Sequence, residues 1–133
     1  MRILFVCVQN TCRSQMAEAY LNHFARERGI EVIAESAGTK GSGELNPLVV
    51  EVMAKEEISL DGQEPKLLTQ EMVDRADKVI SMGCGVDAAA CPARFIVSED
   101  WELEDPHEKP IEFVRQTRDA IRIRVEKLLE HVL

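Results

Sequence analysis

The chain has 133 residues, of which 45% are apolar, so it can bury one compact core and is too apolar for a disordered protein. Lysine and arginine total 16 against 24 aspartates and glutamates, and the resulting formal net charge of −8 argues against a nucleic-acid-binding protein, whose affinity comes mainly from neutralising phosphates. No apolar run is long enough to span a membrane. We therefore expect a single domain over residues 1–133.

Strand-like and helix-like segments alternate along the chain, as in a parallel sheet covered by helices. Residues 2–7 form a continuous apolar run, which is typical of a strand buried on both faces. In residues 13–28 apolar side chains recur at helical spacing, and Gly29 is a suitable stop for that helix. A second strand is expected within residues 31–37, followed by a glycine-rich loop at 39–44.

The alternation continues in the second half of the chain. The Asn46-Pro47 pair is typical of a helix N-cap and first turn, and a short helix is expected at 69–75. Two further strands are expected at 78–82 and 94–98, and a long amphipathic helix at 110–132. The sequence thus predicts an α/β fold with a four-stranded parallel sheet and helices on both faces.

The first strand is followed by a loop whose composition suits a tetrahedral oxyanion. Cys7 and Arg13 enclose five residues, so the backbone N–H groups can point inward while the Arg13 guanidinium closes the ring. These groups and the following helix N-terminus would favour the Cys7 thiolate, with Ser14 bonding the sulfur and Asn10 bracing the loop. If Cys7 were only a buried apolar residue, the Arg13-Ser14 pair would have no explanation. The predicted oxyanion-binding residues are Val8, Gln9, Asn10, Thr11, Cys12, Arg13 and Ser14.

The cysteines suggest thiols with a catalytic or metal-binding role rather than structural disulfides. Because we see no export signal, we expect a cytoplasmic protein whose four cysteines are thiols with a catalytic or metal-binding role. Cys84 follows the third predicted strand, and the carboxyl ends of parallel strands lie at one edge of a sheet. We therefore expect Cys84 and Cys7 to share a site.

The motif Cys7-x5-Arg13-Ser14, followed by Gln15-Met16-Ala17-Glu18, resembles that of the low-molecular-weight protein tyrosine phosphatase fold family. Within this family the chain is most similar to the thioredoxin-coupled arsenate reductases, and the resemblance covers nearly its whole length. It extends to Ser36-Ala37-Gly38, Asn46-Pro47, Cys84, Cys91-Pro92 and Asp105-Pro106. The resemblance implies the three-layer fold of that family.

The resemblance also implies a route from arsenate to arsenite. Cys7 attacks the arsenic, Cys84 attacks the Cys7 sulfur and expels arsenite, and Cys91 passes the disulfide to thioredoxin or a similar dithiol protein. The implied disulfides are Cys7–Cys84 and then Cys84–Cys91, on a segment of small residues at 83–93. Asp105 is the implied general acid, and no metal or other cofactor is expected.

Three other interpretations stay open at this point. A phosphatase of phosphotyrosine or a small phosphoester would need Cys7, Arg13 and Asp105. It would need neither of the two distal cysteines, Cys84 and Cys91. A thiol switch that senses oxidants or oxyanions would form a disulfide without releasing arsenite. A zinc site could use the four cysteines, although their x4 and x6 spacings are wider than those of structural sites. Cys12 has no assigned role.

Some residues depart from the family pattern. Gln9 stands where family loops commonly have glycine, which leaves the local backbone geometry open. His107 follows the Asp105-Pro106 pair where the phosphatases usually have tyrosine, which weakens the phosphatase interpretation. The acidic run at 99–104 could alternatively make this whole region a solvated loop.

A cation site near the loop is a further expectation from the resemblance. Some arsenate reductases bind potassium there through an asparagine, a glutamate, a serine and an aspartate. Asn10, Glu18 and Ser36 match, whereas the aspartate position falls near Lys66. We expect the Lys66 ammonium to replace the metal ion by pairing with Glu18; the alternative is an ordinary surface lysine.

Overall fold

A parallel sheet with the first strand near its centre organises the molecule. The computed structural model describes residues 1–40, 43–82, 98–104, 106 and 108–131. The strands are β1 (Arg2–Cys7), β2 (Ile33–Gly38), β3 (Lys78–Ser81) and β4 (Glu99–Asp100), arranged in the order β2-β1-β3-β4. All three pairings are parallel, which confirms the predicted four-stranded parallel sheet.

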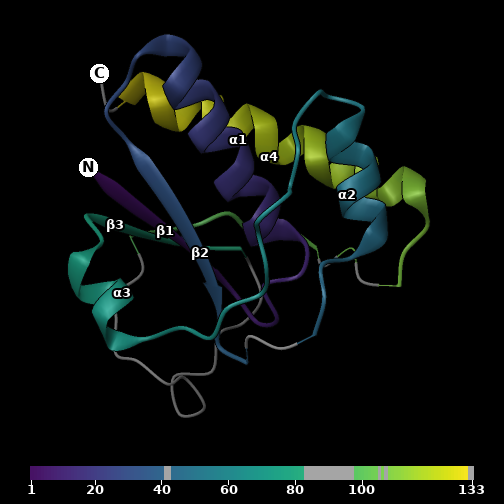
Figure 1. Cartoon of the computed structure of the whole chain (residues 1–133), viewed down its shortest axis with the longest axis horizontal. Coiled ribbons are helices and arrows are strands. Elements are labelled where there is room, and N and C mark those ends of the chain that lie inside the picture. The colour runs from purple at the N-terminus through teal and green to yellow at the C-terminus, as the bar shows by residue number, and fades with distance from the viewer. Residues whose placement is uncertain (41–42, 83–97, 105, 107, 132–133) are drawn as a thin grey trace.

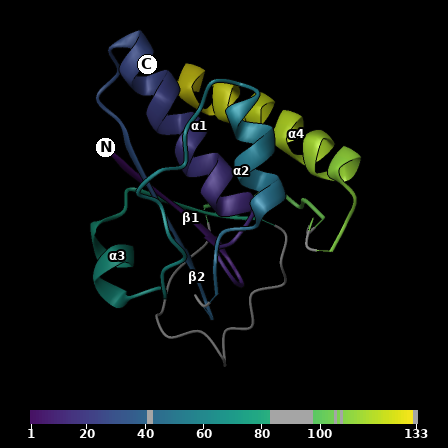
Figure 2. The same ribbon diagram turned by 45° about the vertical axis from the view of Figure 1, so that its right-hand side comes forward.

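Helices cover both faces of this sheet. In Figures 1 and 2, α1 (Arg13–Arg28), α2 (Pro47–Ala54) and α4 (Ile111–His131) lie on one side of the strands and α3 (Gln70–Arg75) lies on the other. The side chains of β1 alternate between two apolar clusters. Ile3, Phe5 and Cys7 belong to the larger cluster with α1, α2 and α4, and Leu4 and Val6 belong to the smaller one. The three-layer α/β architecture is therefore confirmed.

Local sequence signals explain where the helices begin and end. Gly29 adopts the left-handed conformation (φ 66°) just after α1, as glycine does at many helix ends. The Asn46 side chain accepts a hydrogen bond from the Leu48 backbone N–H and so caps α2. Thr69 caps α3 in the same way through the Met72 N–H. The predicted helix at 110–132 corresponds to α4, with residue 132 outside the described residues.

Most of the predicted fourth strand, residues 94–97, lies outside the described residues. Of the predicted residues 94–98, only Ser98 lies within the described residues, and it is a bend that donates its backbone N–H to the Val79 carbonyl. Within the described residues the strand is β4, the acidic pair Glu99–Asp100, for which the sequence leaves a solvated loop open as an alternative. Both residues are exposed at the sheet edge, so charge and strand pairing are compatible there. None of the helices in the described ranges is both long and apolar enough to cross a bilayer.

Candidate active site

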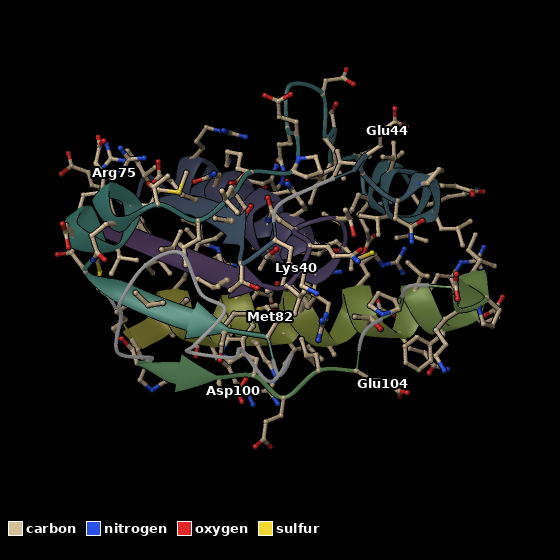
Figure 3. The ribbon with its side chains drawn as sticks, turned by 90° about the horizontal axis from the view of Figure 1, so that it is seen from below. Lys40, Glu44, Arg75, Met82, Asp100 and Glu104 are labelled. Atoms are coloured by element: carbon tan, nitrogen blue, oxygen red, sulfur yellow. The ribbon has the colours of Figure 1, made fainter. Side chains whose placement is uncertain are left out.

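The candidate site lies at the carboxyl edge of the sheet, in the loop of residues 7–14, which we call the 7–14 loop. Lys40, Met82 and Asp100 in Figure 3 mark the neighbouring chain at the ends of β2, β3 and β4. Backbone hydrogen bonds between the two segments continue past β2, since the Thr39 N–H donates to the Cys7 carbonyl (3.0 Å) and the Lys40 N–H to the Val8 carbonyl (2.8 Å). The loop is therefore held from the side by the chain that follows β2.

The Cys7 sulfur has two hydrogen-bond partners within the loop. The Asn10 backbone N–H lies 3.0 Å from Cys7 Sγ, and Ser14 Oγ lies 2.8 Å from it. The Asn10 side-chain amide donates to Ser14 Oγ at 2.7 Å, and the hydroxyl proton of Ser14 can be donated to the sulfur when Cys7 is a thiolate. Cys7 is only 3% exposed. Two donors on a buried sulfur favour the thiolate over the thiol.

Asn10 fixes the loop from within, as the sequence suggests. Its backbone has a positive φ of 62°, which asparagine tolerates better than most residues, and its side chain is fully buried. Its Oδ1 accepts from the Lys66 backbone N–H and from Gln15 Nε2, both at 2.9 Å. Because a backbone N–H can only donate, the orientation of the Asn10 amide is settled, with its nitrogen toward Ser14.

The departure at Gln9 is accommodated without a glycine there. The positive-φ residue of the loop is Asn10, and Gln9 is not among the described residues with positive φ. The loop requires a glycine at another position. A Cβ on Gly38 would lie 2.5 Å from the Val8 carbonyl oxygen and 2.9 Å from the Gln9 carbonyl carbon. Gly38 is also opposite Cys7 in the strand register, so the end of β2 packs directly against the loop.

Arg13 is anchored to the chain that follows β3 and β4. Its Nη1 donates to the Met82 carbonyl at 2.7 Å and also to the Leu103 carbonyl, and the side chain is only 4% exposed. These carbonyls hold the guanidinium beside the hollow that Arg13 lines with Cys7, Gln9, Asn10, Thr11 and Cys12. The side chain of Cys12 does not cap α1, and the first turn contains no acidic residue. The positive end of the helix therefore faces the hollow without a carboxylate of its own turn.

Cys12 is a buried thiol between the loop and α2. Its Sγ lies 3.5 Å from Asn46 Nδ2 and 3.6 Å from Thr11 Oγ1. The Asn46 backbone N–H donates to the Thr11 carbonyl at 3.2 Å. The cap of α2 thus also contacts the outer side of the 7–14 loop.

The predicted pairing of Lys66 with Glu18 is present. Lys66 Nζ lies 3.5 Å from Glu18 Oε1, and the Ser36 hydroxyl donates to the same oxygen at 3.1 Å. Glu18 is buried, so the ammonium offsets a carboxylate that has little contact with solvent. That Lys66 replaces a metal ion stays a prediction. In the part of the chain that the structure describes, no group of three or more His, Cys, Asp or Glu side chains could hold a metal.

Sequence reasoning missed two glutamines beside the loop. Gln15 is fully buried, and its Nε2 donates to both the carbonyl (3.1 Å) and the Oδ1 (2.9 Å) of Asn10. Gln63 contacts Gln15 in turn. Gln15 directly follows the loop motif, but only its burial, which the sequence does not give, shows its role.

The structure brings together all the predicted oxyanion-binding residues, because Val8, Gln9, Asn10, Thr11, Cys12, Arg13 and Ser14 follow Cys7 in one loop and helix turn. The other predicted site residues, Cys84, Cys91 and Asp105, lie outside the described residues, as does His107. Their roles stay predictions.

The family is decided by a comparison over nearly the whole chain. The family model for the low molecular weight phosphotyrosine protein phosphatases matches residues 2–133. The chain belongs to this family. The expected fold family is thereby confirmed, and the protein is an enzyme of this family.

The relatives are divided between two activities. The chain is 34% identical to a glutaredoxin arsenate reductase of Synechocystis, with 98% of both proteins covered. It is 36% identical to the solved thioredoxin-dependent arsenate reductase of Corynebacterium glutamicum, with a TM-score of 0.78 over 98% of this chain and 61% of that one. It is 28% identical to a solved arginine phosphatase mutant with a phosphorylated active-site serine, with a TM-score of 0.85 over 99% and 95%. The family members similar to this chain therefore include arsenate reductases and phosphatases.

Proposed function

We propose that this protein reduces arsenate to arsenite, with Cys7 as the nucleophile and a thioredoxin-like protein as the reductant. The observation that carries the proposal is the setting of the Cys7 sulfur, 2.8 Å from Ser14 Oγ and 3.0 Å from the Asn10 N–H. A thiolate stabilised in this way at the floor of an anion-shaped loop suits attack on the central atom of a tetrahedral oxyanion.

The first step forms a bond between sulfur and arsenic. Arsenate binds against the inward N–H groups of the 7–14 loop and the Arg13 guanidinium, which Met82 and Leu103 hold in place. The Cys7 thiolate attacks the arsenic, and one arsenate oxygen leaves as water. Asp105 is our proposed donor of the proton for that oxygen. The Ser14 hydroxyl and the Asn10 N–H keep the sulfur deprotonated until attack.

The second step reduces the arsenic. The Cys84 thiolate attacks the Cys7 sulfur, the sulfur–arsenic bond breaks, and its electron pair stays on arsenic, which leaves as arsenite. Cys91 then attacks Cys84 and releases Cys7 as a thiolate. The protein's thiols supply the two electrons that reduce the arsenic, and they end as the Cys84–Cys91 disulfide. A dithiol protein then reduces this disulfide back to two thiols.

The distal cysteines favour the reductase over the phosphatase, because a phosphatase needs no further thiol after Cys7. Two relatives named as arsenate reductases support the same choice. Their names give two kinds of reductant, glutaredoxin for one and thioredoxin for the other. We propose thioredoxin because the pair Cys84 and Cys91 can form an internal disulfide, which a dithiol protein can reduce.

The deciding experiment couples arsenate reduction to NADPH oxidation. Reduced protein is mixed with arsenate, thioredoxin, thioredoxin reductase and NADPH, and arsenite release is followed. We expect multiple turnovers that vanish in Cys7→Ser and in Cys84→Ser. Cys91→Ser should give at most one turnover per molecule. A parallel reaction with glutaredoxin, glutathione and glutathione reductase identifies the reductant, and sustained cycling of Cys91→Ser with thioredoxin would contradict the relay.

A phosphatase is the second candidate, and the similarity to a solved arginine phosphatase at a TM-score of 0.85 favours it. Such an enzyme would hydrolyse a phosphorylated substrate equally well in the wild type and in Cys84→Ser. If no arsenite is released while hydrolysis persists, this activity replaces the reductase. If a disulfide forms on oxidation without either activity, the protein is a thiol switch.

A further inference from the structure

A contact between two glutamines joins the 7–14 loop to a distant turn. Gln63 Nε2 donates to Gln15 Oε1 at 2.6 Å and lies 3.3 Å from the Gln15 carbonyl oxygen. Gln63 follows Gly62, whose φ is 86°, and its own backbone N–H donates to the Leu60 carbonyl. A tight turn therefore sets the position of the Gln63 side chain, far in sequence from the loop.

The Gln15 amide has a single possible orientation. Its Nε2 faces three acceptors, namely the carbonyl and Oδ1 of Asn10 and the Glu64 carbonyl, at 2.9–3.1 Å. Since carbonyl oxygens only accept hydrogen bonds, the nitrogen must lie on this side and Oε1 on the other. Gln15 is fully buried, so its Oε1 needs a donor, and Gln63 supplies one.

The same contacts continue to the sulfur. Gln15 holds both the backbone carbonyl and the side-chain oxygen of Asn10, the residue with positive φ. The Asn10 side-chain Nδ2 donates a hydrogen bond to Ser14 Oγ at 2.7 Å, and Ser14 Oγ lies 2.8 Å from Cys7 Sγ. Each member of this series is uncharged apart from the sulfur itself. The series therefore acts by fixing where hydrogen-bond donors point.

We infer that Gln63 is a positioning residue for the Cys7 thiolate, acting through Gln15, Asn10 and Ser14. This inference rests on the proposed role of Cys7 as nucleophile. When Gln63 cannot donate, the buried Gln15 Oε1 loses its partner and the Gln15 side chain shifts, because a buried unsatisfied oxygen is unfavourable. Asn10 then holds the Ser14 hydroxyl less firmly on the sulfur, and the thiol form of Cys7 gains over the thiolate.

The test measures the reactivity of Cys7 against pH. Gln63→Met removes the donor without changing charge and with little change in volume. We expect alkylation of Cys7 by iodoacetamide, identified by peptide mass analysis, to slow about threefold to tenfold near pH 7 and to recover at alkaline pH. Arg13 and Cys12, the charged and titratable groups that line the same hollow, are unchanged in this variant. Gln116→Met, at an exposed position of α4, is the matched control and should leave the profile unchanged.

A double substitution separates positioning from a general loss of structure. Ser14→Ala removes the last donor of the series, so Gln63→Met should add almost no further change to the alkylation profile of Ser14→Ala. Equal profiles for wild type and Gln63→Met, or a full additional effect in the Ser14→Ala background, would overturn the inference. If Cys7 of the wild type titrates like an ordinary thiol, this result contradicts the proposed role of Cys7 as nucleophile. It then also contradicts the inference about Gln63, which rests on that role.

Discussion

Gly38 shows how one residue on a neighbouring strand determines the shape of the 7–14 loop. Its α-carbon carries no side chain at the point where β2 ends opposite Cys7, and the Val8 carbonyl occupies the space that a Cβ would need. Both contacting groups are backbone, so neither can move aside by a change of rotamer. The loop and Gly38 must therefore be treated as one unit.

Gly38→Ala should displace the loop and slow every reaction of Cys7. The added methyl group would lie 2.5 Å from the Val8 oxygen, and overpacking of this kind costs about 1–3 kcal/mol. Urea unfolding and Cys7 alkylation measure the two effects. Gly29→Ala is the control, since it strains a positive φ at the end of α1 but meets no atom within 4 Å. It should lower stability and leave Cys7 reactivity intact; equal reactivity in both variants would contradict the packing argument.

Tyr20 carries a buried hydroxyl with no hydrogen-bond partner in the described part of the chain. Burial, assisted by the Glu56 carboxylate, raises the pKa of Tyr20 well above its ordinary value of 10.0. Since the pKa of Tyr20 is higher in the folded protein than in the unfolded chain, folding favours the neutral phenol. The contribution of this pKa shift to the free energy of unfolding is fully present below about pH 10 and is lost as the pH rises further.

Tyr20→Phe should therefore be neutral or stabilising at pH 7, by up to about 1 kcal/mol, and should make unfolding less sensitive to alkaline pH. Tyr20 is the only tyrosine in the chain, so tyrosinate absorption during an alkaline titration reports on this residue alone. We expect that absorption to appear together with unfolding. Ionisation near pH 10 in the folded protein would show that solvent reaches the hydroxyl.

At the level of elements, the two capped helices differ in what their caps contact. Asn46 caps α2 and also lies against Cys12 of the loop, whereas Thr69 caps α3 at an exposed site on the opposite face of the sheet. The comparison of these caps separates the cost of uncapping a helix from the cost of losing a contact with the site.

Asn46→Ala and Thr69→Ala should each lower the free energy of unfolding by about 1 kcal/mol. Only Asn46→Ala should also increase the alkylation of Cys12, because its amide covers that sulfur. Chemical unfolding and peptide mass analysis of alkylated protein give both quantities. If Cys12 is equally protected in the two variants, Asn46 has no role beyond its helix.

The elements that could be predicted from sequence are those with strong local signals. The apolar run of β1 and the periodicity and glycine stop of α1 gave bounds that match the structure. The strand character of Glu99 and Asp100 could not be predicted, because these residues have no apolar pattern and form a strand only by pairing with Ile80 and Ser81. Pairing across a sheet depends on residues distant in sequence.

The same division applies to the site. Cys7, Asn10 and Ser14 follow from one local motif, so their meeting at the sulfur could be predicted. Gln15 and Gln63 could not, because an uncharged amide gives no sign in sequence that it is buried or which distant partner it meets. The anchoring of Arg13 by the Leu103 carbonyl depends likewise on the packing of a loop 90 residues away.

At the level of the whole molecule, binding of an oxyanion should stabilise the fold. A ligand at a hundred times its Kd adds about 2.7 kcal/mol to the stability of the state that binds it. We expect the thermal unfolding midpoint to rise with phosphate or arsenate concentration and to rise little in Arg13→Lys, whose single ammonium cannot reproduce the fork of donors.

Chloride at matched ionic strength is the necessary control, because the net charge of −8 opposes compaction and any salt screens it. An equal rise in chloride would mean that screening alone acts. An equal rise in Arg13→Lys would mean that the anion binds elsewhere.

The backbone hydrogen bonds just beyond β2 have a consequence for amide hydrogen exchange. The N–H groups of Thr39 and Lys40 lie outside the strand, yet they donate to the carbonyls of Cys7 and Val8. They can exchange with solvent deuterium only when this part of the 7–14 loop separates from the chain after β2. Their exchange rates therefore measure how often the loop opens, independently of substrate, reductant or any assay of turnover.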